Sequence, residues 1–310
     1  MSLSAPRALA ALALVAGLAV SVAGAASTQP SAAGMTIAAA DIPGSKLVSQ
    51  GKLAAGGYLS AYQRTLKLTS PYGRSEIVGI QSEGKLAANA KQVTTDLSVV
   101  QRVLNSPSGR SGFVAGIASK LQVSATAVKL GAVRHPRVGD GTVELPLSIQ
   151  LPTAKAYESL LYMRLDRVFE VLVVVGARPI ASADSANLAR ILQMHITQQL
   201  TPVDVTPPAI TGTVAVGQAV TVTPGTWSNP DVALTYQWQR CDGTGANCAA
   251  IAGATSTTYT IEATDAGSTF EVVETATDRF GAPTATSTAT AVVPAPPSLP
   301  EPSPGPPPSP

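Results

Sequence analysis

The chain has 310 residues, of which 45% are hydrophobic and 13% are charged, a balance that excludes wholesale disorder. Its length is sufficient for two domains with ordinary cores. The formal net charge of +2 hides an asymmetry. Residues 26–203 carry 18 Lys and Arg against 10 Asp and Glu, a net charge of +8, whereas residues 204–293 carry 2 against 8, a net charge of −6.

The N-terminus is typical of a secretory signal peptide over residues 1–25. Arg7 precedes an apolar run over residues 8–22, and the small residues Ala-Gly-Ala end the segment at Ala25. The run is shorter than the roughly 20 residues that span a bilayer. We therefore expect cleavage near Ala25, export, and no transmembrane segment in the mature chain. The Ser- and Ala-rich residues 26–40 are predicted to form a flexible leader.

Residues 41–200 mix strands and helices. The segments GGYLSAYQRTLKL and SEIVGIQ predict two early strands. Apolar residues then recur every third or fourth position over residues 86–104, which predicts a helix stopped by the sequence Asn-Ser-Pro, and a second helix is expected over residues 111–121. Four strands follow, of which FEVLVVVGA is apolar on both faces and belongs at the centre of a covered sheet. With a last helix that begins at Ser182, this order predicts an α+β sandwich.

This order of elements resembles that of the PsbP-like sandwich found in photosystem extrinsic subunits and in exported actinobacterial proteins. The resemblance covers about residues 40–200 and lies in the paired central helices and the final amphipathic helix. It implies a fold and brings no catalytic motif with it.

Residues that carry chemistry are scarce in this domain. The chain's two histidines are His135 and His195, and we expect His195 in the core or at its rim because it lies on the apolar face of the last helix. The loop RHPRVGDG places His135 between Arg134 and Arg137, three groups suited to a phosphate or carboxylate, with a solvated basic loop as the alternative. No phosphate-binding or zinc-protease motif occurs. We expect no catalytic residue, no cofactor and no metal site.

A Pro-rich linker and a second domain follow. Three prolines in TPVDVTPPAI predict a stiff linker over residues 201–208. Residues 209–293 contain seven short strand-like segments, with turn residues about every 8 to 12 positions. That spacing indicates an all-β, immunoglobulin-like sandwich. The tail over residues 294–310 has the composition of a polyproline II segment and is expected to be disordered.

Cys241 and Cys248 are the chain's two cysteines, separated by a Gly-rich turn. A zinc site would need further Cys or His ligands near them, and a redox pair would have the spacing C-x-x-C. Exported proteins meet an oxidising environment in which paired cysteines form disulfides. We therefore predict a structural disulfide.

The runs VGQAVTVTPGTWSNP and YQWQRCDGTGANCAAIAGATSTTYTIEATDAGSTFEV resemble the Ig-like repeat of extracellular actinobacterial proteins, in which GTW, YQWxRC, IxGAT, TYT and DxG recur in that order. The resemblance covers nearly all of residues 207–293. It implies that Trp238 is the core tryptophan of the third strand, and that Asp265 and Gly267 shape the turn before Phe270.

From these features we expect an exported bacterial envelope protein, secreted or held at the cell surface, with a non-catalytic binding or scaffolding role. Envelope polyanions or surface proteins are the expected partners, and no nucleic-acid partner is expected. Two alternatives stay open: the first domain carries a small anionic or lipophilic ligand, or it is a hydrolase. A cleft that collects polar side chains would favour the enzyme, and a deep apolar pocket would favour the carrier.

Overall fold

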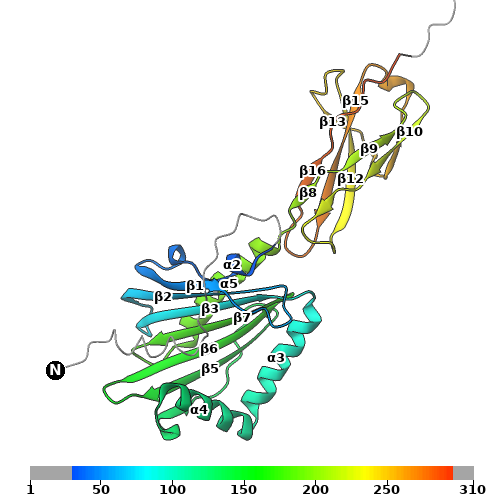
Figure 1. Ribbon diagram of the computed structural model, residues 1–310. Helices are drawn as coiled ribbons and strands as arrows, with labels where there is room; N and C mark the ends of the chain where they lie inside the picture. Colours follow the sequence, from blue (N-terminus) through cyan, green and yellow to red (C-terminus); the bar gives the residue numbers. More distant parts are fainter. Residues whose placement is uncertain (1–29, 296–310) are drawn as a thin grey trace, which may run out of the picture. The chain divides into compact units, whose positions relative to one another are not determined.

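The computed structural model describes residues 30–295, and this part of the chain divides after Gln199 into two compact units (Figure 1). The predicted signal peptide and residues 296–310 of the predicted tail lie outside the described residues. None of the helices within residues 30–295 is both long and apolar enough to cross a membrane.

The first unit is built on one antiparallel sheet of seven strands in the order β1-β2-β3-β7-β6-β5-β4. The strands are β1 (Ser45–Lys52), β2 (Ser60–Tyr72), β3 (Ile77–Leu86), β4 (Val128–Leu130), β5 (Gly141–Gln150), β6 (Lys155–Leu165) and β7 (Val168–Gly176). Strand β7 holds the segment that is apolar on both faces, and it lies at the centre of the sheet, where side chains on both faces are covered.

Helices pack on both faces of this sheet. On one face lie α3 (Ala90–Asn105) and α4 (Pro107–Leu121), which enclose two apolar clusters with β5, β6 and β7 (Figure 1). On the other face lies α5 (Ser182–Leu200), where the Ser185 hydroxyl donates to the carboxylate of Glu144 at 2.6 Å. Glu144 leaves β5 on the side opposite to Val143 and Leu145, because strand side chains alternate.

The second helix begins earlier than the sequence predicts. Pro107 was expected to lie in a break before a helix over residues 111–121, yet it is the first residue of α4. Ser106 accepts a hydrogen bond from the Gly109 backbone at 3.1 Å and caps the helix. A proline fits this position because the first helical N–H groups have no partner within the helix. Leu86, expected in the first helix, ends β3 instead.

Residues 30–40 are not the flexible leader that composition predicts. They form the short helix α2 (Ala32–Met35) and lead to the 3₁₀ turn η2 (Ala39–Asp41), with Met35 and Ile37 fully buried. The Ile37 backbone donates to the Ser82 hydroxyl of β3 at 3.0 Å. This segment is ordered because a few large apolar side chains are buried, and a composition rich in Ser and Ala does not reveal that burial.

His195 ties the same segment to α5. Its Nδ1 lies 3.1 Å from the Thr36 carbonyl, and its Nε2 lies 3.2 Å from the Asp41 carboxylate. The side chain is thus at the rim of the first unit's core.

The second unit consists of short antiparallel strands. They are β8 (Asp204–Thr206), β9 (Ala209–Gly212), β10 (Ala219–Thr223), β11 (Thr226–Trp227), β12 (Ala233–Cys241), β13 (Ala249–Ala250), β14 (Thr258–Thr260), β15 (Thr269–Thr277) and β16 (Thr284–Thr286). One sheet has the order β14-β10-β9 and another β13-β12-β15-β16, while β8 pairs with β11. Part of the predicted linker is therefore a strand. Its prolines flank residues 204–206, so the backbone N–H and C=O groups of these residues can form the hydrogen bonds of a β-ladder.

The two larger sheets of this unit share one core. Val220 and Val222 of β10 pack with Trp238 of β12 and with Phe270 and Val272 of β15. The described chain is thus a mixed α and β structure built mostly on antiparallel sheets.

Candidate functional site

The first unit contains a pocket whose floor is the middle of the sheet. Strands β6, β7 and β3 lie side by side there, and their alternate residues point towards α4. Tyr162, Val171 and Glu83 form one row across the three strands, and Leu160, Val173 and Gln81 form the next. Glu158 lies one row further along β6, opposite Val175.

The wall of the pocket is one face of α4. Gly112, Phe113, Gly116, Ile117 and Lys120 line it, at the spacing of a single helical face. The cavity has a volume of about 380 Å³. A Cβ atom added at either glycine would meet nothing within 4 Å.

The pocket is apolar in the middle and polar at its ends. Leu160, Val171, Val173 and side chains of α4 form the apolar belt. Glu83 and Glu158 lie two strands and four residues apart, so their Cα atoms are separated by about 16 Å at the usual strand spacing and rise. Each carboxyl group thus belongs to its own end of the pocket.

The side chain of Glu158 is largely buried, lines the cavity and has no partner within the described part of the chain. The residue is only 4% exposed, and no hydrogen bond or ion pair joins its carboxyl group to another residue in the described part of the chain. Burial raises the pKa of Glu158 to about 7. Burial also raises the pKa of Tyr162, with a further contribution from the charge of Glu83.

The opposite end of the pocket is already neutralised. The Glu83 carboxylate pairs with Lys85 at 2.9 Å, and Lys85 also lies 5.8 Å from the ring centre of Tyr58. Lys120, the cationic side chain among the lining residues, has an interaction of its own.

Of the three residues predicted to bind an anion, Arg134 and His135 already contact main-chain carbonyl groups. Arg134 donates from Nη1 to the Ile180 carbonyl at 3.2 Å, and the same nitrogen lies 3.7 Å from the buried Glu144 carboxylate. The Nδ1 atom of His135 lies 3.1 Å from the Thr142 carbonyl. His135 and Arg137 are exposed. Arg134 also lines a second hollow of about 310 Å³.

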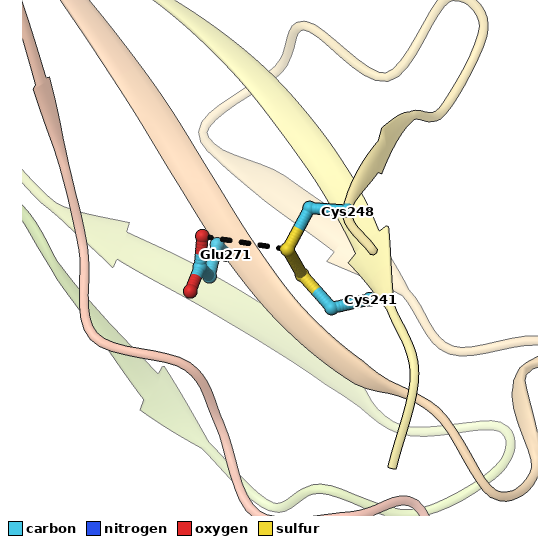
Figure 2. Close-up of side chains that lie close together, drawn as sticks. All are labelled: Cys241, Cys248 and Glu271. Atoms are coloured by element: carbon cyan, nitrogen blue, oxygen red, sulfur yellow. Dashed lines mark hydrogen bonds between the residues drawn. A yellow bond between two sulfur atoms is a disulfide. The ribbon is translucent and has the colours of Figure 1, made fainter. Parts of the chain in front are cut away.

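The predicted disulfide between Cys241 and Cys248 is present in the second unit (Figure 2). Figure 2 also shows Glu271 of β15 beside it, with the Cys248 sulfur 3.7 Å from a carboxylate oxygen. The three residues place their ligand atoms within 4.8 Å of one another, as a metal site would. Metals bind the thiolate form of cysteine, and bonded sulfurs have no thiolate to offer, so Glu271 supplies the single anionic ligand.

Asp242 organises the turn that this disulfide closes. It accepts hydrogen bonds from the Thr244 hydroxyl at 2.6 Å, from the Ala246 backbone at 3.0 Å and from the Asn247 side chain at 2.7 Å. These bonds hold the pKa of Asp242 well below its usual range. The sequence DGTGAN thus uses its carboxylate within the turn.

Trp238 is fully buried in the core of the second unit. Its indole N–H donates to the Ser256 carbonyl at 2.9 Å, and its ring lies 5.7 Å from that of Tyr259. Asp265 accepts hydrogen bonds from the Tyr259 hydroxyl and the Glu262 backbone, and Gly267 takes a φ of +84° in the following turn. These contacts are structural.

Sequence reasoning missed the pocket residues. The available signals were weak: Glu158 is a charged residue within a largely apolar strand, and Gly112 and Gly116 fall within a helix, where glycine is unfavourable. Neither signal identifies a partner segment. The pocket forms only when β3, which lies over seventy residues earlier in the chain, pairs with β7.

Comparison with known proteins gives no family. No family model matches the chain, and no curated protein matches it. Among solved structures, the chain is similar to the extracellular domain of PknH from Mycobacterium tuberculosis, with 10% sequence identity and a TM-score of 0.33. That likeness covers 56% of this chain and 98% of the other.

Proposed function

We propose that this protein is an exported, non-catalytic binding protein, and that the pocket between α4 and strands β3, β7 and β6 is its ligand site. Export rests on the signal-peptide pattern of residues 1–25 and fits the disulfide of the second unit. The proposed location is outside the cell, secreted or at the surface. The proposed ligand is a small, largely lipophilic molecule.

One observation carries this proposal: an apolar pocket of ligand size is lined by a largely buried glutamate whose carboxyl group has no partner among the described residues. The volume of about 380 Å³ falls within the range of small-molecule sites, which run from about 300 to 1,000 Å³. Such sites are mostly apolar and contain few polar groups, as here. A buried polar group without a partner destabilises a fold, and a ligand that pairs with it removes that penalty.

The two glycines of α4 support the same assignment. Glycine in a helix interior costs about 1 kcal/mol relative to alanine. Neither Gly112 nor Gly116 is needed for close packing, because a Cβ atom would meet nothing within 4 Å at either position. By contrast, a Cβ atom at Gly109 would lie 2.2 Å from the Val103 carbonyl oxygen. Gly112 and Gly116 are exposed, and they leave the α4 wall of the pocket without a side chain at two positions.

A hydrolase is less well supported than a binding protein. Glycosidases place two carboxyl groups about 5 to 9.5 Å apart across the scissile bond. The pocket acids Glu83 and Glu158 lie at opposite ends, about 16 Å apart at Cα. We therefore do not propose paired-acid catalysis.

We further propose that the first unit is a PsbP-like sandwich and the second an Ig-like one. The central paired helices and the final helix support the former, and two sheets around Trp238 support the latter. The second unit would act as a spacer or as a contact module for surface proteins. The basic first unit would contact envelope polyanions through a weak electrostatic association, which added salt would reduce.

The test is binding of N-phenyl-1-naphthylamine, a neutral lipophilic dye that fluoresces in apolar surroundings, to the mature chain. We expect saturable fluorescence with the native protein and loss of it in Gly116→Leu, whose side chain would enter the pocket. The control is Ala115→Leu, which also introduces a leucine on α4, at the neighbouring exposed position that does not line the pocket. Equal dye binding by all three proteins, or none by the native protein, would reject the pocket as the ligand site.

A further inference from the structure

The side chains around the pocket favour a cation over an anion. Glu158 provides an unpartnered carboxyl group, and Tyr162 and Phe113 provide aromatic rings. Carboxylates and aromatic faces both attract cations. Lys120 of α4 also lines the pocket and has an interaction of its own.

Two other buried carboxylates of the first unit, Glu144 and Asp184, are satisfied, and Glu170 lacks a partner but is fully enclosed, whereas Glu158 lines the cavity. Glu144 accepts from the hydroxyls of Ser159 at 2.7 Å and Ser185 at 2.6 Å. Asp184 accepts from the Ser75 backbone and hydroxyl at 2.8 and 2.6 Å. Glu158 has no such donors among the described residues and lines the cavity instead. What it lacks is a donor, and the cavity is where a donor would enter.

We propose that the pocket binds an amphiphilic amine, with the ammonium group paired to the Glu158 carboxylate and the apolar part lying against Leu160, Val173 and Phe113. This inference rests on the proposed function, because it names the ligand class of that same pocket. An ammonium ion supplies three donors and a positive charge to the group that lacks both. An alcohol of equal length supplies one donor and no charge, and a carboxylate ligand would place two acids together.

Binding of an amine should depend on pH. In the free protein burial keeps Glu158 largely protonated below about pH 7. The other titratable groups that line the pocket are Glu83 on β3, Tyr162 on β6 and Lys120 on α4, while β7 contributes only apolar side chains. Pairing with a cation favours the charged carboxylate, so binding releases a proton at acidic pH. Affinity for the amine should therefore rise as pH increases through about 7.

The experiment compares three probes of one chain length on the mature protein: n-octylamine, n-octanol and n-octanoate. Each competes with N-phenyl-1-naphthylamine for the pocket at about pH 8 and about pH 5.5, either side of the pKa of Glu158. At the higher pH we expect octylamine to bind about tenfold more tightly than octanol, the factor that a charge-assisted hydrogen bond supplies. At the lower pH that preference should shrink.

The decisive variant is Glu158→Gln, which keeps the shape of the side chain and removes its charge. It should bind octanol and the dye as the native protein does and lose the preference for octylamine. Glu76→Gln, the same change at a surface ion pair outside the pocket, should keep the preference.

Two results would overturn the inference: octylamine and octanol binding alike to the native protein, or a preference for octylamine that survives Glu158→Gln. Tighter binding of octanoate would overturn it too. In each of these cases dye binding that Gly116→Leu abolishes would leave the proposed function standing. If the dye and all three probes fail to bind, both proposals fall.

Discussion

Glu158 makes a prediction about stability that does not require the ligand. Burial raises the pKa of its carboxyl group from 4.5 to about 7. Between these values the folded protein binds more protons than the unfolded chain, so its free energy of unfolding falls as pH rises. The contribution is fully favourable below about pH 4.5 and is lost once pH passes about 7. Since one pKa unit corresponds to about 1.4 kcal/mol, the loss is about 3 kcal/mol.

Replacing Glu158 with glutamine should remove this pH dependence. Glutamine resembles the protonated acid at every pH, so Glu158→Gln should be about 3 kcal/mol more stable than the native protein near pH 8 and about as stable as it near pH 4.5. Glu170 is fully buried and has a raised pKa as well, but it is present in both proteins and cancels in the difference. Glu76→Gln serves as the control, because it changes the same charge at the surface.

Urea unfolding can follow the two units separately. Helices α3 and α4 lie in the first unit, so the far-ultraviolet circular dichroism of helix reports it. Both tryptophans of the chain, Trp227 and Trp238, lie in the second unit, so their fluorescence reports that one. The reasoning would be refuted if native and Glu158→Gln proteins showed parallel stability curves, or if the variant were less stable near pH 8.

Four other perturbations test the remaining proposals. Replacing both Cys241 and Cys248 with serine should lower the stability of the second unit by about 2.5 kcal/mol and leave the first unit's helix signal unchanged; an unchanged tryptophan transition would contradict this. Trp238→Ala should cost about 3 to 5 kcal/mol, and native tryptophan fluorescence that iodide quenches freely would oppose the packing behind that value. The first unit should co-sediment with purified envelopes at low salt and be released at about 0.5 M salt. Binding that is unchanged between the two salt concentrations would contradict the polyanion proposal. The double variant Arg134→Ala/Arg137→Ala tests only the loop that carries these two residues. If the variant still binds envelopes, this loop is not the contact site.

The regular elements follow from local pattern, and so does much of their placement. FEVLVVVGA is apolar on both faces, which predicts a central strand, and β7 occupies that place in the sheet. The positions from Val93 to Leu104 face the core at helical spacing. Where local pattern misleads, as at Pro107, the cause is a cap: Ser106 and Pro107 both stop one helix and begin the next.

The pocket could not be predicted in the same way, because its parts are distant in sequence. Its floor depends on the register of β3 against β7 and of β7 against β6, which sets Glu83 and Tyr162 in one row. A shift of one residue in either pairing would send these side chains to the opposite face. The leader was missed for a related reason, since Met35 and Ile37 are buried only because distant strands leave them a surface to cover.

Several residues that line the pocket of the first unit are unfavourable for the stability of the fold. Gly112 and Gly116 each cost about 1 kcal/mol against alanine, and the buried Glu158 costs about 3 kcal/mol at neutral pH. Together these are comparable with the whole stability of a marginal domain, about 5 to 15 kcal/mol. Glu170 is also unsatisfied, but it is fully enclosed on the opposite face of the sheet, and a Cβ atom at Gly84 would lie 2.9 Å from its carboxyl oxygen. Glu158 differs because it lines open volume, beside two glycines that no packing requires. Three unfavourable choices that meet at one cavity are the pattern expected when a site is kept for binding at the expense of stability.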